Sequence, residues 1–68
     1  MTPHRVHVFY TSPRDGWCAT VLTVEGYQIG EGSYSYLKTD AIGDAKRHGL
    51  PVHIFGQNGL EQRVVKCG

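Results

Sequence analysis

The chain has 68 residues, of which 40% are hydrophobic and 19% are charged, and its formal net charge at pH 7 is +1. This length predicts a single small domain, residues 1–68, and excludes a two-domain enzyme or a large enclosed active site. The apolar content is too high and the charge too balanced for a disordered tail. The charge also disfavours a free-standing nucleic-acid binder, because such proteins gain affinity by neutralising phosphates.

Cysteine usage and the N-terminal residues bear on the compartment. Cys18 and Cys67 lie far apart and form no CxxC pair, whereas a secreted chain of this size usually carries several disulfides. The first residues lead directly into a strand-like stretch without the apolar segment of a signal peptide. No apolar run approaches the roughly 20 residues that span a bilayer. These features predict a cytoplasmic protein with reduced thiols and no membrane partner.

Three stretches rich in β-branched and aromatic residues predict strands at residues 6–11, 17–24 and 27–29. The first ends at a turn cluster that finishes in Asp15 and Gly16. The third is weaker, because Gly30 and Gly32 interrupt it and indicate a bend or bulge. We expect these strands to form an antiparallel meander.

A short helix follows the third strand. Thr39 is the expected N-cap, Asp40 suits the positive end of the helix dipole, and Gly49 stands where a C′ residue belongs, before Pro51. The apolar stripe at helical spacing consists of Leu37, Ala41, Ile42 and Ala45. Because Gly43 costs about 1 kcal/mol relative to alanine inside a helix, this helix must pack on a sheet.

The last part of the chain reads as a hairpin. Residues 52–55 and 60–66 are apolar-rich, and Asn58 and Gly59 between them predict a type I′ turn. The order is then three strands, one helix and two strands. The predicted fold is α+β, with an antiparallel sheet of four to five strands and one helix on one face.

One helix covers one face of such a sheet. Alternation assigns to the face beneath the helix Val6, Val8, Tyr10, Trp17, Ala19, Val21, Val52 and Ile54. It assigns to the opposite face His7, Phe9, Leu22, His53 and Phe55, with Val65 as a further candidate. An apolar patch on a small domain marks a partner surface, so we expect a homodimer or another protein partner, with association sensitive to pH near the ordinary histidine pKa of about 6.5. Alternatively, the fifth strand, the glycine stretch or the N-terminus folds over part of this face.

Catalytic and metal sites are weakly signalled. Residues 29–35 resemble the start of a kinase glycine-rich loop, but the rest of that signature is missing, so a bent edge strand is favoured. His7, His53 and Cys18 could share one face, yet a structural zinc site needs four ligands in tight spacing. A Cys18–His7 nucleophile pair would need an orienting acid and a pocket. We therefore predict a non-enzymatic protein without cofactor or metal, and a cysteine- or metal-dependent enzyme is a distant third hypothesis.

Nucleic-acid binding is the alternative function. The cations that would carry it are Lys38, Lys46, Arg47 and Arg63, and Phe9 or Phe55 could stack on bases. Against this reading, helix C-termini and edge strands ordinarily carry such cations.

Three stretches resemble a known bacterial family: DGWCA at residues 15–19, TDAIGDA at 39–45 and VHIFGQNGL at 52–60. They are similar to the strand, helix start and closing hairpin of the domain-of-unknown-function 2188 family, which comprises short bacterial proteins. The helix here is shorter than in that family and lacks its basic extension, and residues 27–36 carry a tyrosine-glycine stretch. The resemblance implies a helix-on-sheet fold and no particular activity.

Overall fold

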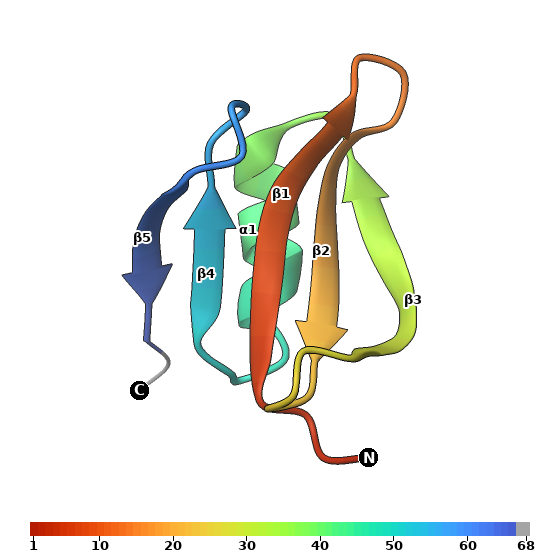
Figure 1. Ribbon diagram of the computed structural model, residues 1–68. Coiled ribbons are helices and arrows are strands. Elements are labelled where there is room, and N and C mark those ends of the chain that lie inside the picture. Colours follow the sequence, from red (N-terminus) through yellow and green to blue (C-terminus); the bar gives the residue numbers. More distant parts are fainter. Residues whose placement is uncertain (67–68) are drawn as a thin grey trace.

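The computed structural model describes residues 1–66, in which six elements follow one another in the predicted order (Figure 1). They are β1 (Arg5–Ser12), β2 (Gly16–Leu22), β3 (Gln28–Ser35), α1 (Lys38–Lys46), β4 (Val52–Phe55) and β5 (Glu61–Val65). The α+β class with one helix and a five-stranded sheet is therefore confirmed. Cys67 lies outside the described residues.

The strands lie side by side in the order β3-β2-β1-β4-β5. The first three form the expected antiparallel meander, and β4 and β5 form an antiparallel hairpin. The expectation of a wholly antiparallel sheet is wrong at one place, because β4 runs parallel to β1. The reason lies in the connection: β3 runs parallel to β1, and a helical crossover returns the chain in the same direction.

The third strand is longer than the sequence indicated and bends at its glycines. Ala19 pairs with Ser33 and Val21 with Ile29, so β3 uses more residues than β2 over this stretch. At this irregularity Gly30 adopts a positive φ of 69°. A Cβ atom on Gly32 would lie 2.6 Å from Cys18 Sγ and 3.1 Å from Thr20 Oγ1. The glycine stretch therefore passes close to the side chains of β2.

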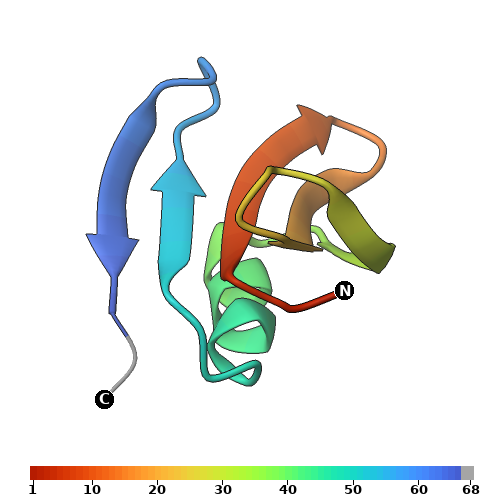
Figure 2. The same ribbon diagram turned by 60° about the horizontal axis from the view of Figure 1, so that its bottom comes forward.

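The helix packs on one face of the sheet, called the inner face below (Figure 2). The buried core consists of Val6, Val8, Ala19, Ala41, Ile42, Ala45, Val52 and Ile54. Ala41 and Ala45 are fully buried, and their small side chains let the helix backbone approach the strands. The predicted inner-face set is confirmed at these strand positions, with Trp17 and Val21 partly buried against the core.

Helix α1 begins earlier than predicted. Its N-cap is Leu37 rather than Thr39, and no side chain caps it. The Lys38 ammonium group lies 5.2 Å from the centre of the Trp17 ring and donates a hydrogen bond to Gln62, which fixes Lys38 in the first turn. Leu37 is 61% exposed and so is not part of the apolar stripe. The helix ends at Lys46, and Gly49 adopts the expected left-handed conformation.

The β4–β5 hairpin is present, but its turn is not type I′. That turn requires positive φ at two successive residues, whereas only Gly59 has one here, at 85°. Asn58 instead accepts a hydrogen bond from the Leu60 N–H through Oδ1, and the Gly59 N–H donates to the Gly56 carbonyl. The result is a longer loop that shifts the register between Ile54 and Phe55.

Helix α1 is far shorter than a membrane-crossing helix, and within residues 1–66 no helix has the length and apolarity needed to span a bilayer.

Candidate functional site

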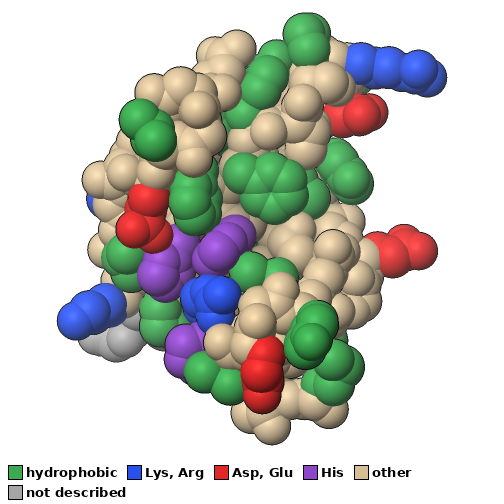
Figure 3. Space-filling model, in the orientation of Figure 1, with side chains coloured by type: hydrophobic (Ala, Val, Ile, Leu, Met, Phe, Trp, Pro, Cys, Tyr) green, Lys and Arg blue, Asp and Glu red, His purple; other side chains and the backbone are tan. Residues whose placement is uncertain are grey.

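The face of the sheet opposite the helix, called the outer face below, carries the predicted interaction residues. These are His7 and Phe9 on β1, Leu22 on β2, and His53 and Phe55 on β4. All five are half-buried. In Figure 3 this face is turned toward the viewer, and the histidines lie next to apolar side chains in its middle. The prediction that these residues share one face therefore fits the observed pairing.

Three of the five residues touch one another. His7 and His53 stand opposite each other on the parallel pair β1 and β4, with their ring centres 5.3 Å apart. The His7 ring also lies 4.9 Å from the Phe55 ring. Phe9 and Leu22 lie elsewhere on the same face, opposite Cys18 and Arg5 respectively. The centre of the outer face is thus the group His7, His53 and Phe55.

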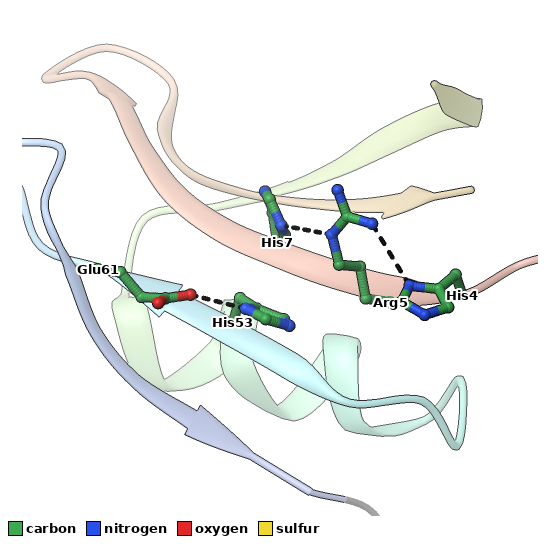
Figure 4. Close-up of polar contacts among 5 residues, drawn as sticks. All are labelled: His4, Arg5, His7, His53 and Glu61. Carbon is green, nitrogen blue, oxygen red and sulfur yellow. Dashed lines mark hydrogen bonds and ion pairs between the residues drawn. The ribbon is translucent and has the colours of Figure 1, made fainter. Parts of the chain in front are cut away.

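Two charged residues that the sequence analysis did not select complete this group. The Arg5 Nε–H donates to His7 Nε2 over 3.0 Å, and Glu61 Oε1 lies 2.6 Å from His53 Nδ1 (Figure 4). We call Arg5, His7, His53 and Glu61 the histidine cluster. Alternation along β1 could have placed Arg5 on the outer face, because Arg5, His7 and Phe9 follow one another at intervals of two residues. The position of Glu61 beside His53 depends on the register shift in the β4–β5 hairpin, so alternation in the sequence does not predict it.

Arg5 also ties β1 to the turn between β2 and β3. Its Nη1 donates to the carbonyl oxygen of Thr23 over 2.9 Å and lies 3.5 Å from that of Val24. The same nitrogen lies 3.3 Å from His4 Nδ1. One guanidinium group therefore links the His7 ring to the end of β2.

The hydrogen bond from Arg5 defines the state of His7. Because His7 Nε2 accepts this bond, it carries no proton, and the neutral ring is protonated at Nδ1. The pKa of His7 is lowered from 6.5, first by burial, then by the positive charges of Arg5 and His53, while Glu61 opposes the shift. At neutral pH the centre of the outer face therefore holds an uncharged imidazole.

More exposed apolar side chains lie on the same face, on either side of this centre. Val64 stands opposite His53 on β5 and is 41% exposed, and Tyr34 stands opposite Cys18 on β3 and is 61% exposed. The suggestion that Val65 belongs to the outer face is wrong. Val65 pairs with Val52 and packs against the core, because the register shift in the hairpin turns it inward.

Cys18 has no catalytic geometry. It is buried, and its Sγ lies 3.3 Å from Thr20 Oγ1, whereas His7 stands opposite Thr20. Gly32 closes over both side chains. The suggested alternative that the glycine stretch folds over part of the outer face is thus realised at β2. Within residues 1–66, no group of three or more His, Cys, Asp and Glu side chains is arranged to hold a metal ion.

The cations of the alternative nucleic-acid hypothesis are dispersed. Lys38 and Lys46 stand at opposite ends of α1, and Arg63 is opposite Ile54 on β5. Lys38 packs on Trp17, and Arg47 lies 3.9 Å from Asp44. The structure does not bring these four cations into one patch.

No family model, curated protein or solved structure matches this chain. The resemblance to the domain-of-unknown-function 2188 family therefore stays a prediction that depends on the three short motifs.

Proposed function

We propose that this chain is a small, non-enzymatic interaction module of the cytoplasm that forms a homodimer through the outer face of its sheet. The observation that carries the proposal is the row of side chains across β5, β4 and β1, centred on His7, His53 and Phe55. Helix α1 covers the inner face only, so this row is left to solvent in a single copy. An exposed patch that combines apolar side chains with a few polar groups is typical of association sites.

The charges of the histidine cluster favour a second copy as the partner. Arg5 stands at one end of the cluster and Glu61 at the other, with two histidines between them. A two-fold axis lying in the interface, across the middle of the cluster, would place Arg5 of each copy over Glu61 of the other. Such self-complementarity is what a symmetric dimer requires. A polyanion would instead meet a carboxylate at this site.

The dimensions of the chain are also compatible with a dimer. Its two longest principal extents are 31 and 23 Å. A standard interface buries about 800 Å² on each partner, which is less than a fifth of the accessible surface of 4562 Å². The cytoplasmic location is part of the proposal because two cysteines are too few for the disulfide framework that is usual in a secreted chain of this size.

Sedimentation equilibrium on the wild type and on Phe55→Asp tests the proposal. We expect a wild-type dimer at micromolar or higher concentration. Phe55→Asp places an unpaired carboxylate in the interface of each copy, and it should raise the dissociation constant by more than about a hundredfold.

Leu37→Asp is the matched control, since it introduces the same charge at an exposed apolar residue where the helix begins. This variant should remain dimeric. A wild type that stays monomeric at millimolar concentration contradicts the proposal, as does a Phe55→Asp variant with unchanged mass. Binding of DNA or RNA that is lost in Lys46→Glu would favour the alternative function instead.

A further inference from the structure

We propose that self-association through the outer face is controlled by protons, with His7 as the group that must be neutral in the dimer. This inference depends on the proposed function, because it concerns the regulation of the same face. It makes the dimer stable at neutral pH and unstable in acid.

His7 acts as a hydrogen-bond acceptor toward Arg5. The Arg5 Nε–H donates to His7 Nε2 over 3.0 Å. A proton on His7 Nε2 would turn this acceptor into a donor, and two donors would then face each other. Arg5 cannot relieve the conflict by losing its own proton. A protonated His7 must therefore lose this bond, and Arg5 is held near by the Thr23 carbonyl oxygen.

The charges around His7 also favour its neutral form. On its own strand it faces Arg5, which also contacts His4. On β4, the ring centre of His53 lies 5.3 Å from that of His7. His53 in turn bonds to Glu61 of β5. On β2, the residue opposite His7 is Thr20, which carries no charge. The charges of Arg5 and His53 lower the pKa of His7, and the one carboxylate, Glu61, already has His53 as its partner.

His7 and His53 therefore differ in what a proton would meet. A proton on His53 Nδ1 is shared with the Glu61 carboxylate at 2.6 Å. A proton on His7 Nε2 meets the Arg5 guanidinium group, which is a donor and a cation, and His7 has no carboxylate of its own. Covering the face with a second copy removes water from His7 and raises the cost of its charge, while the Glu61 carboxylate of that copy is paired with Arg5 and not with His7. His7 is the group whose protonation opposes the dimer.

The size of the effect follows from proton linkage. If each copy must release one proton from His7 to associate, a dimer releases two protons in the pH range between the pKa values of the dimer and the monomer. Within this range, the dissociation constant of the dimer should then rise by as much as about a hundredfold for each unit by which the pH is lowered. This range lies below pH 6.5, because burial, Arg5 and His53 lower the pKa of His7 already in the single copy.

The experiment measures the dissociation constant by sedimentation equilibrium from about pH 8 to about pH 5 at constant ionic strength, with circular dichroism to confirm the fold at each pH. The wild type should show a constant value above pH 6.5 and a steep rise below it. His7→Gln should remain dimeric with a flat profile, because the glutamine amide oxygen can accept from Arg5 without a titratable group. His48→Gln, which changes an exposed histidine after the helix, should follow the wild type.

A second measurement uses the wild type alone and does not depend on any variant folding. The midpoint of the His7 ring titration, followed by NMR, should fall as the protein concentration increases, since the dimer favours neutral His7. A midpoint that does not change with concentration overturns the inference, as does a steep pH profile that persists in His7→Gln. A wild-type dimer with no pH dependence refutes the proton control and leaves the proposed function standing. A wild type that is monomeric at every pH refutes both.

Discussion

Replacing Gly32 with alanine tests whether β3 closes over the outer side of β2. The added Cβ atom would lie 2.6 Å from Cys18 Sγ, a distance that real Cβ atoms essentially never show, and 3.1 Å from Thr20 Oγ1. Both neighbours are buried, with exposed fractions of 3% and 5%, so neither has free space to move into. The φ of Gly32 is not in the left-handed region, so the cost comes from crowding and not from backbone strain.

Crowding of this kind in a packed interior costs about 1–3 kcal/mol. Alanine also restricts the unfolded chain, which offsets about 0.4–1 kcal/mol of that cost. We expect Gly32→Ala to lower the free energy of unfolding by about 1–2 kcal/mol. A chain of this length has roughly 3–10 kcal/mol in total, so the loss is a substantial share of its stability.

Urea denaturation followed by Trp17 fluorescence measures this loss, and a double-mutant cycle assigns it to a partner. Cys18→Ala removes the Sγ atom that the new Cβ would meet. In that background Gly32→Ala should cost less by about 1 kcal/mol, since residues in contact couple whereas distant ones add. A Gly32→Ala variant as stable as the wild type would refute the close approach of β3. Equal costs in the two backgrounds would refute the contact with Cys18.

Three further predictions concern the helix and the histidine cluster. Gly43 lies inside α1, and a Cβ atom added to it would meet nothing within 4 Å. Gly43→Ala should therefore raise the free energy of unfolding by about 1 kcal/mol and the melting temperature by about 4–8 °C. A lower melting temperature would contradict this expectation. Leu37→Asp should add about 1 kcal/mol, since the N-cap has extended φ and ψ of −101° and 135° but no side-chain acceptor, and urea denaturation would detect the gain or its absence. The free energy of unfolding should fall as the pH is lowered below 6.5, because His7 has a higher pKa in the unfolded chain than in the folded chain. Unfolding curves at several pH values should show this loss in the wild type and a smaller one in His7→Gln.

Local patterns predicted the strands, the helix and the two sheet faces, because each depends on alternation or helical spacing that neighbouring residues determine. Val8 and Ile54 are buried and His7 and His53 share the other face for this reason. The parallel pairing of β1 with β4 has no comparable signal. It depends on where the chain returns after the helix, and that is a property of the whole sheet.

The errors have local causes that only the folded chain supplies. Thr39 has the better capping side chain, but the helix begins one residue earlier, at Lys38, whose ammonium group contacts Trp17 and Gln62. Asn58 could have adopted a positive φ, but its side chain bonds to the Leu60 N–H instead. The resulting register shift places Glu61 beside His53. The polar half of the candidate site thus comes from a turn whose conformation the sequence did not predict.

The bend of β3 changes which part of the outer face can associate. Gly32 covers Cys18 and Thr20, so the middle of β2 is withdrawn from the surface that a partner can reach. What stays accessible runs from β1 across β4 to β5, where Phe55 and Val64 flank the histidines. The accessible surface is therefore centred on the histidine cluster and not on an apolar plane. A partner that covers it must accommodate Arg5, two imidazoles and Glu61 together, and this is why the charge state of His7 governs association in the proposed dimer.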